Sequence, residues 1–437
     1  MSMVSQLKMK VVSWWSRADP YVVRDVSRRF RKGMALFWWY GVFISMSSAF
    51  VDSYITLYIL SLGATSLQVG SLSSLASFFA MLMPLPGAQW AAHWGKRKPV
   101  ILISYGLRYV ALLGALLLPL MRSGPALILV VIGLFALRTA FLHLGNSPWT
   151  SFAGDLVPPN RRGRYFSSRK AAMALASLIF VPLAGQLIGL FPEPTGYQMS
   201  FVIAIVWGAF ALYLFARIPR PEPTERAIKR RFTLAFWRVL KADPTFWRFT
   251  LISVFFNFAW QFGGPYFGVY QVEVLGATSR IIGWLSMASS FMRMIGQQIW
   301  GRAVDRRGAS WVFVMCLIFI PILPFIWLPL TAPWQIIFIN VPSGFLWAGR
   351  EIANFNLLLR LADEERQTEA IASYNTLLAM ANILGPLAGG QVIQMLGYRW
   401  TFALSGFGRA IAAIMFFALL KPFDLRGLVA RLRPQRG

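Results

Sequence analysis

The sequence predicts an all-α membrane protein in which twelve transmembrane helices form two pseudo-symmetric six-helix bundles around a central cavity. Three observations predict this fold: an apolar composition, twelve apolar runs of membrane-spanning length, and a repeat that relates the two halves of the chain. Of the 437 residues, 57% are hydrophobic and 14% are charged, and the mean hydropathy is +0.56. A chain of this size with so much apolar surface belongs in a lipid bilayer.

The apolar runs lack the period-two alternation of membrane β-barrel strands, so they predict helices, the other structure that satisfies backbone polar groups within lipid. Each run is near the roughly 20 residues that a bilayer requires. The predicted spans, numbered 1 to 12 in chain order, cover residues 34–61, 66–92, 99–121, 125–150, 171–191, 198–217, 247–272, 279–302, 310–330, 333–358, 370–395 and 400–420.

A repeated pentapeptide relates the two halves. Leu62–Ser66 reads LGATS and returns 213 residues later as Leu275–Ser279, in each case between the first two spans of a half. At the same offset Gly70 matches Gly283. The register extends too far to be a coincidence, so the chain contains two copies of one unit.

A second repeat fixes the relative orientation of the copies. Pro182–Gly185 in span 5 returns as Pro386–Gly389 in span 11, now at an offset of 204 residues, so the halves differ by insertions in their loops. Because each copy has an even number of spans, both copies have the same orientation in the membrane, which is a parallel repeat.

The net charge of +27 would suit nucleic acid if the basic residues were gathered on one face. Instead, 35 of the 43 Lys and Arg residues lie in the two termini and in the loops after spans 2, 4, 6, 8 and 10, and only Arg122, Arg280 and Arg399 lie in the opposite loops. This is the positive-inside distribution. It predicts an integral multi-pass protein of the cell (inner or plasma) membrane, with both termini cytoplasmic, basic loops against an anionic inner leaflet, and no nucleic-acid partner.

The same features divide the chain into predicted segments. Residues 1–33 form a basic cytoplasmic segment, 34–217 the N-terminal bundle, 218–246 a cytoplasmic linker, 247–420 the C-terminal bundle and 421–437 a basic cytoplasmic tail. The first segment lacks the features of a cleavable signal peptide. Within and just beyond the linker, 232–247 mixes aromatic and basic residues, which predicts an amphipathic helix on the inner leaflet.

Catalytic and nucleotide-binding motifs are missing from the sequence. Neither a Gly-x-x-x-x-Gly-Lys-Ser/Thr loop nor a His-Glu-x-x-His pair occurs. Cys316 is the single cysteine, which excludes an intramolecular disulfide and a cysteine metal cluster. We therefore expect neither an enzyme nor a primary pump, and no cofactor or metal.

The loop between spans 8 and 9 has a defined glycine and aspartate spacing. Gly301 is followed four residues later by Asp305 and, after three more, by Gly308, with Arg306 among the basic residues between them. The first half keeps a glycine and a basic cluster at this place but has Ala92 where the aspartate would stand. After span 4 the chain has an acidic-x-x-Pro-x-x-x-Arg-Gly pattern, from Asp155 to Gly163.

These motifs, which cover both halves, resemble the loop signatures of the major facilitator superfamily. The resemblance implies a cytoplasmic latch, in which carboxylates at helix ends pair with arginines while the cavity faces outward. With Ala92 in place of the acid, Asp155 takes more of this role in the first half. The predicted latch residues are Gly95, Arg97, Asp155, Arg162, Gly301, Asp305, Arg306 and Gly308.

Ionisable residues within spans cost roughly 2.5–3.5 kcal/mol on insertion scales, so each one needs a partner or a functional reason. Asp52 lies in span 1 on one helix face with Ser45, Ser48 and Thr56. In the resembling family span 1 lines the pathway, so Asp52 is the proton-coupling candidate; the alternative is an Asp52 permanently paired with Arg138 or held by hydroxyl groups. The other cavity and substrate candidates are Arg138, His143, Asn146, Asn257, Gln261, Ser290, Arg293, Gln297, Arg350, Glu351 and Asn354.

Two further arginines lie in spans that the resembling fold places outside the cavity. Arg108 is in span 3 and Arg409 is in span 12, so structural pairing or snorkelling is expected for both. In span 7, Gly263–Pro265 marks a place where the helix can bend.

The resemblance and the charges together predict a secondary active transporter of a small organic solute that works by alternating access and functions as a monomer, with proton coupling as one option for its energy source. Arg138, Arg293 and Arg350 exceed Asp52 and Glu351 by one charge, which favours an anionic or acidic amphiphilic substrate. One alternative is a pump for lipophilic drugs or lipids, in which Asp52 pairs with Arg138, Glu351 pairs with Arg350 or Arg293, and the cavity is otherwise hydrophobic and aromatic. Another is a non-transporting assembly factor or receptor with the same fold.

Overall fold

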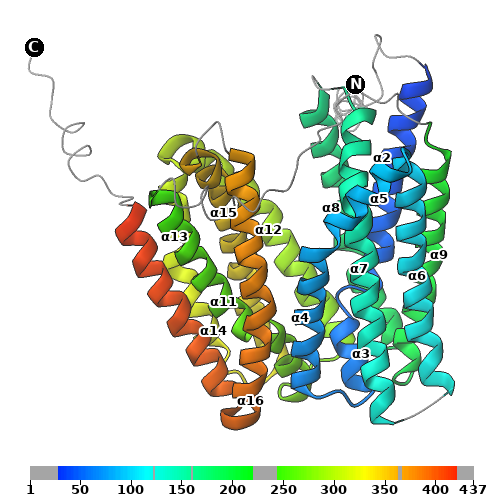
Figure 1. The fold of residues 1–437 in the computed structure, drawn as a ribbon. Helices are drawn as coiled ribbons and strands as arrows, with labels where there is room; N and C mark the ends of the chain where they lie inside the picture. The colour runs from blue at the N-terminus through cyan, green and yellow to red at the C-terminus, as the bar shows by residue number, and fades with distance from the viewer. Residues whose placement is uncertain (1–27, 122–123, 159–160, 220–243, 363–366, 421–437) are drawn as a thin grey trace, which may run out of the picture.

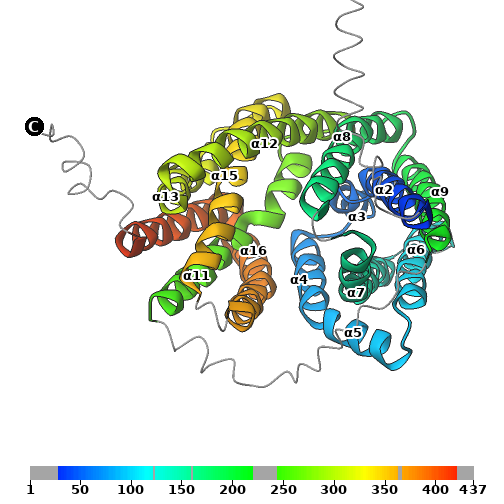
Figure 2. The ribbon, with the colours of Figure 1, turned by 90° about the horizontal axis from the view of Figure 1, so that it is seen from above.

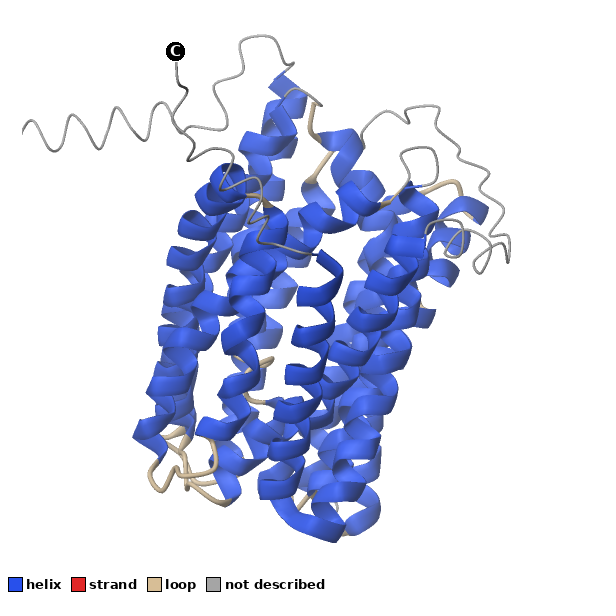
Figure 3. Cartoon of the chain, turned by 90° about the vertical axis from the view of Figure 1, so that its left-hand side faces the viewer, coloured by secondary structure: helices blue, strands red, loops and turns tan. Residues whose placement is uncertain are grey.

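A computed structural model describes residues 28–121, 124–158, 161–219, 244–362 and 367–420, and within these ranges every regular element is a helix (Figures 1 and 3). The N-terminal half is built from α2 (Arg28–Ala49), α3 (Ile55–Ser61), α4 (Ser66–Leu82), α5 (Pro84–His93), α6 (Arg97–Met121), α7 (Pro125–Leu156), α8 (Arg162–Ile188) and α9 (Thr195–Arg217).

The C-terminal half repeats this order. It is built from α11 (Pro244–Glu273), α12 (Ser279–Arg307), α13 (Ala309–Phe319), η2 (Ile320–Ile322), α14 (Leu323–Ile326), η3 (Pro333–Ile336), α15 (Ile337–Leu361) and α16 (Gln367–Leu420). Helix α16 contains spans 11 and 12, which join at Gly397, a residue with a φ of 81° that no regular helix has. Counted by spans, the predicted twelve helices are confirmed.

Seven helices in the described ranges are long and apolar enough to cross a membrane, and one of them is the double-length α16. The spans that do not meet this test are 1, 7, 8 and 10. These four spans hold nine of the twelve residues predicted for the cavity. Their polar side chains lower the hydropathy of the spans, which is why these spans do not meet the test.

Two spans of the first half are interrupted, each for a local reason. Span 1 ends its first helix at Ala49 and begins its second at Ile55, so Asp52 stands in a non-helical turn. Span 2 is interrupted at Met83 because Pro84 lacks an amide hydrogen and starts a new helix. In span 7, by contrast, α11 runs without interruption through Pro265.

The repeated pentapeptide forms the same turn in both halves. Gly63 and Gly276 have positive φ values of 91° and 67°, which glycine adopts without strain. In the first copy Thr65 Oγ1 accepts a hydrogen bond from the Gln68 amide at 3.3 Å, and Gln68 Oε1 accepts one from the Thr65 amide at 2.8 Å. This reciprocal capping box starts α4.

The two halves pack against each other along two helix pairs (Figure 2). Within the N-terminal half α2 packs on α8 and α9, and α7 packs on α4 and α6; within the C-terminal half α11 packs on α16, and α12 on α15. Between halves the main contacts are α4 with α16 and α8 with α12. The four helices are spans 2, 5, 8 and 11, so the interface has the same pseudo-twofold symmetry as the sequence repeat.

The halves are joined at one end and diverge toward the other (Figure 1). We call the end that holds the two pentapeptide turns the pentapeptide end, and the end that holds Gly95 and Gly308 the basic end. Four side-chain hydrogen bonds cross between the halves in the described residues, and all four lie in the part of the helices nearer the pentapeptide end.

Several predicted segments lie outside the described residues or extend beyond predicted bounds. Residues 1–27, 220–243 and 421–437 are not described, so most of the predicted N-terminal segment, linker, amphipathic helix and tail fall there. Helix α8 begins at Arg162, nine residues before the predicted start of span 5, because the basic residues after span 4 continue directly into the helix.

Candidate functional site

Five arginines occupy one level of the bundle. Each lies twelve to fourteen residues from the pentapeptide end of its helix, which at 1.5 Å per residue is about 20 Å. They come from α6, α7, α12, α15 and the second part of α16, and they are Arg108, Arg138, Arg293, Arg350 and Arg409. This level lies near the middle of a bilayer about 30 Å thick, where unpaired charge is most costly.

In the N-terminal half, two arginines approach one carboxylate. Arg138 Nη2 lies 2.6 Å from Asp52 Oδ1, and Arg108 Nη2 lies 4.0 Å from the same oxygen. Both arginine side chains are 5% exposed, whereas the Asp52 side chain is 48% exposed. The turn between α2 and α3 therefore presents a carboxylate to two buried guanidinium groups and leaves the rest of its surface open.

Arg108 is one of the two arginines that sequence reasoning placed outside the cavity. The expected pairing is found, but its partner is the central Asp52, and Arg108 Nη2 also lies 3.5 Å from Ser48 Oγ. The residue does not snorkel, because it sits at mid-helix with 4% exposure. Its depth, which along the spans equals that of Arg138, was the available signal.

The remaining candidates in span 4 form a chain of polar contacts toward α6. Asn146 Nδ2 lies 3.3 Å from His143 Nδ1, and Tyr105 donates its hydroxyl to Asn146 Oδ1 at 3.2 Å. Both contacts are partly buried. His143 and Asn146 thus have protein partners within the N-terminal half.

The C-terminal half arranges its charges differently. Arg293 Nη1 on α12 lies 2.7 Å from Glu351 Oε1 on α15, and the two side chains are 42% and 50% exposed. Of the two pairings considered for Glu351, the structure shows the one with Arg293. Neighbouring Arg350 points elsewhere and has no carboxylate within 4 Å among the described residues.

Arg350 is held by aromatic faces. Its guanidinium carbon lies 4.5 Å from the ring centre of Phe256 and 5.1 Å from that of Trp347, and the residue is 8% exposed. Its Nε has no hydrogen-bond partner in the described part of the chain. Cation–π attraction compensates only part of the cost of burying a guanidinium group.

Arg409 lies near Arg350 and is also buried. It donates to Ser405 Oγ at 3.0 Å and to the Trp260 carbonyl at 3.5 Å, and its Nε is unpaired within the described ranges. As expected, it is held by neighbouring polar groups in its own half, although none of them is a carboxylate. The five arginines of this level thus face two carboxylates, an excess of three positive charges.

The uncharged candidates of the C-terminal half lie in two groups. Asn257 donates to Asn382 Oδ1 and to the Leu378 carbonyl, and the Gln261 side chain lies beside Gly385, so both residues bind span 7 to span 11. Asn354 accepts a hydrogen bond from the Tyr374 hydroxyl at 3.3 Å. Ser290 and Gln297 are exposed on α12, on either side of Arg293 along the helix.

Sequence reasoning missed Arg169, which it assigned to a loop. The residue lies in α8 with 5% exposure, and its guanidinium carbon lies 4.6 Å from the ring centre of Phe37 and 5.4 Å from that of Trp149. Its Nε donates to the Phe37 carbonyl at 3.2 Å. Gly41 gives it room, since a Cβ there would lie within 2.5 Å of Nε. The signal was the basic run that continues into α8.

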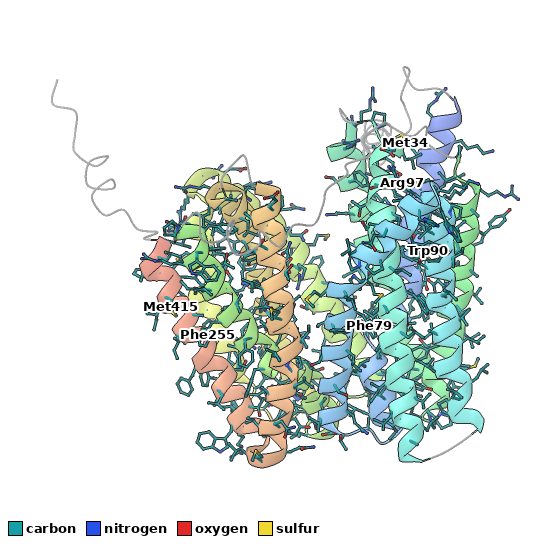
Figure 4. The ribbon with its side chains drawn as sticks, viewed as in Figure 1. Met34, Phe79, Trp90, Arg97, Phe255 and Met415 are labelled. Atoms are coloured by element: carbon teal, nitrogen blue, oxygen red, sulfur yellow. The ribbon has the colours of Figure 1, made fainter. Side chains whose placement is uncertain are left out.

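At the basic end, Arg97 forms an ion pair with Asp155 (Figure 4 labels Arg97). Arg162 donates to the carbonyls of Val157 and Gly154, so it closes the turn after α7 and does not pair with Asp155. Gly95 and Gly308 have φ values of 60° and 86° and form the turns between helices. Asp305 and Arg306 are exposed near the end of α12, and Asp305 has no ion pair within the described ranges; Gly301 lies one turn earlier in that helix.

Comparison with known proteins gives two relatives that match over almost their whole length and a third that matches over part of it. The chain is 24% identical over 410 residues to the multi-drug resistance efflux pump PmrA of Streptococcus pneumoniae, covering 88% of this chain and 96% of that protein. It is 22% identical over 392 residues to a putative sugar efflux transporter of Deinococcus radiodurans, covering 87% and 96%. A chloramphenicol efflux pump of Mycobacterium tuberculosis is 25% identical over 271 residues, 58% of this chain and 60% of that protein.

Solved structures agree on the fold. The nucleoside transporter NupG has a TM-score of 0.69 at 14% identity and covers 90% of this chain and 100% of that chain. A bacterial homologue of the human lysosomal transporter Spinster, in an inward-facing and unoccupied conformation, has a TM-score of 0.66 at 15% identity and covers 91% and 98%.

The family profile of the Major Facilitator Superfamily matches residues 37–279 and 258–433, which include both six-helix halves. The duplicated bundle, the interface of spans 2, 5, 8 and 11, and the membrane-length apolar helices agree with this match. The chain is therefore a multi-pass membrane transport protein, not an enzyme, and it belongs to the major facilitator superfamily.

Proposed function

We propose that this protein is a secondary active transporter that moves an organic anion or an acidic amphiphile by alternating access. The single observation that carries the substrate class is the excess of three buried or half-buried guanidinium groups at mid-membrane depth. An anionic group of a substrate would balance part of this excess positive charge. Arginine binds carboxylate and phosphate through two parallel N–H donors, which suits it to this role.

Arg350 is the proposed principal contact for the anion. Arg138 and Arg108 already have Asp52, and Arg293 already has Glu351. Within the described ranges Arg350 has no carboxylate within 4 Å, and its guanidinium group lies over the rings of Phe256 and Trp347. A carboxylate would pair with its guanidinium group, and the adjacent rings would pack on an apolar body, which together describe an acidic amphiphile.

The conformation fits one state of a transport cycle. If the basic end is cytoplasmic, as the positive-inside distribution predicts, the contacts at the pentapeptide end close the outer side, and the diverging ends of the halves face the cytoplasm. The Arg97–Asp155 pair lies within the N-terminal half, so it can persist in this state. Both termini would then be cytoplasmic in the cell membrane, with the monomer as the working unit and the basic loops against anionic lipid.

Asp52 is proposed as the group that links ion movement to this cycle. It is the carboxylate in contact with Arg138, and its side chain is half exposed, which leaves a carboxylate oxygen accessible for protonation. If Asp52 instead stays ionised as a fixed counterion, transport by an Asp52→Asn variant would keep the pH dependence of the wild type.

A second candidate function is efflux of lipophilic drugs. The relatives named as multi-drug and chloramphenicol efflux pumps favour it, as does the aromatic surrounding of Arg350. For this function the charges would have structural roles, and neutral or cationic compounds would bind as well as anions. No observation favours the non-transporting receptor.

The test measures melting temperature for purified full-length protein in lipid nanodiscs. Benzoate and decanoate are compared with their neutral amides and with benzylammonium and decylammonium at equal concentration. We expect the anions to raise the melting temperature of the wild type and of Arg399→Gln, an exposed arginine outside the site, but not that of Arg350→Gln. Stabilisation by the amines alone would contradict the anion proposal, and stabilisation by the amides would favour drug efflux.

A further inference from the structure

Two hydrogen-bonded chains join the halves at the pentapeptide end, one on each side of the interface. We name them clasp A, formed by Ser66, Tyr398 and Glu273, and clasp B, formed by Ser279, Tyr197 and Glu193. In each clasp a serine of one half contacts a tyrosine of the other half, and that tyrosine donates to a glutamate. Neither clasp contains a residue of the arginine level.

The geometry fixes the direction of the hydrogen bonds. Tyr398 donates to Glu273 Oε2 at 2.5 Å, and its oxygen lies 2.8 Å from Ser66 Oγ. A tyrosine has a single hydroxyl hydrogen, so Ser66 is the donor to Tyr398. By the same argument Ser279 donates to Tyr197 at 3.2 Å, and Tyr197 donates to Glu193 Oε1 at 3.2 Å.

The clasps follow the internal repeat of the chain. Ser66 and Ser279 are the last residues of the two pentapeptides and the first residues of α4 and α12. Tyr197 and Tyr398 stand at the start of the last span of each half. Each half therefore contributes one serine and one tyrosine, and each of these binds the other residue type in the opposite half.

Close glycine contacts lie directly behind each clasp. On the side of clasp B, a Cβ on Gly283 would lie 2.9 Å from the Tyr54 hydroxyl and 3.1 Å from Pro182 Cα. On the side of clasp A, Gly70 meets Tyr266 and the carbonyl of Pro386. Tyr54 and Tyr266 donate to the carbonyls of Val181 and Pro386 in the same places. Small residues at helix interfaces allow this approach of backbones.

The clasps differ in their contact with water. Ser279 and Tyr197 are 5% and 2% exposed, so the bond of clasp B that crosses between the halves is buried, and its Tyr197–Glu193 bond is partly buried. The Tyr398–Glu273 bond is exposed and the Ser66–Tyr398 bond is only partly buried. When the halves separate, water replaces the partners of clasp A easily, whereas Ser279 and Tyr197 of clasp B lose their mutual bond in a buried place that water must first enter.

We propose that clasps A and B form the gate of the pentapeptide end, that both must break before this end opens, and that the buried clasp B contributes more to the closed state. Tyr54 lies two residues from Asp52 in the same non-helical turn of span 1. The turn therefore joins the gate to the charged level, so a change in the pairing of Asp52 is transmitted directly to the contacts behind clasp B.

The test measures the distance across the gate in full-length protein reconstituted in nanodiscs. Spin labels on Leu190→Cys and Met395→Cys, residues of opposite halves that are 70% and 79% exposed, report opening by double electron–electron resonance. We expect Tyr197→Phe to raise the ratio of open to closed molecules about 10-fold and Tyr398→Phe to raise it less. Tyr58→Phe is the matched control, because it removes a buried tyrosine hydroxyl whose 2.9 Å bond to the Ala115 carbonyl stays within one half.

A double-mutant cycle keeps the test independent of general destabilisation. Ser279→Ala combined with Tyr197→Phe should open the gate no more than the larger single effect, because both substitutions break the same bond. Equal responses of Tyr197→Phe, Tyr398→Phe and Tyr58→Phe, or additive effects in the cycle, would overturn the proposal. The readout requires no substrate, so its result does not depend on the proposed anion.

Discussion

The two halves of this transporter are alike at the gate and unlike at the charged level. At the gate, Gly70 and Gly283 occupy equivalent places, and the serines that end the two pentapeptides do the same. At the charged level, Arg138 and Arg350 lie 212 residues apart in spans 4 and 10, yet Arg138 meets Asp52 and Arg350 meets two aromatic rings.

This difference between the gate and the charged level shows which parts of the duplicated unit have the same role in both halves. At the gate the two halves pack against each other across the pseudo-twofold axis, so both halves need small residues and hydroxyl groups at equivalent places. At the charged level the proposed anion would meet a carboxylate-paired guanidinium group in one half and the aromatic-flanked Arg350 in the other. Span 1 is broken and has a carboxylate at this level, whereas α11 is unbroken and has none there, as such a division of roles requires.

The largest expected effect is a difference in the free energy of unfolding between variants of the two ion pairs. Asp52→Asn leaves Arg138 and Arg108 buried without a carboxylate, and breaking a buried pair on one side costs about 3–5 kcal/mol. Because Asp52 is half exposed, we expect about 2–3 kcal/mol. Glu351→Gln removes the partner of Arg293, but both of these side chains are about half exposed, so the cost should stay below about 1 kcal/mol.

The free energy of unfolding, measured by denaturant titration in mixed micelles, checks this pair of values. The double variant Asp52→Asn with Arg138→Gln serves as the control, since it should recover part of the lost stability. Similar costs for Asp52→Asn and Glu351→Gln would mean that the two halves hold their charges in equivalent ways.

The next effect concerns the symmetry of the gate. Gly70→Ala and Gly283→Ala place a methyl group against the opposite half, and overpacking of this kind costs about 1–3 kcal/mol. We expect both variants to open the gate to a similar degree, as seen with the label pair at Leu190 and Met395. Gly106→Ala is the control, because nothing lies within 4 Å of a Cβ at that position.

A strongly unequal response of the two glycine variants would show that one side of the interface carries the closure. In that case the repeat would reflect the common origin of the halves and not a shared mechanical role.

Hydropathy was enough to predict the twelve spans, because lipid restricts the chain to helices of roughly fixed length. The repeated sequence segments were enough to divide the spans into two halves. The depth of Asp52, Arg138 and Arg350 could also be counted along the spans. Which charged groups pair with each other could not be predicted from the sequence. Arg108 pairs with Asp52, which lies in the turn at 50–54. Glu351 pairs with Arg293 and not with the adjacent Arg350. Such choices depend on side-chain direction across helices, which a linear pattern does not contain. Arg169 was missed because a basic run was interpreted as a loop, whereas aromatic rings bury it.

The smallest expected effect tests the two copies of the pentapeptide turn. Thr65 and Thr278 both precede a helix, but only Thr65 has a capping box, because the residue three positions on is Gln68 in the first copy and Ile281 in the second. Loss of a capping side chain costs about 1 kcal/mol. Thr65→Ala should therefore destabilise the protein by about this amount, and Thr278→Ala by a few tenths at most. Thr65→Ser, which keeps the acceptor oxygen, should retain the stability of the wild type. If Thr278→Ala costs as much as Thr65→Ala, the threonine of the repeat acts through packing at the gate and not through the cap.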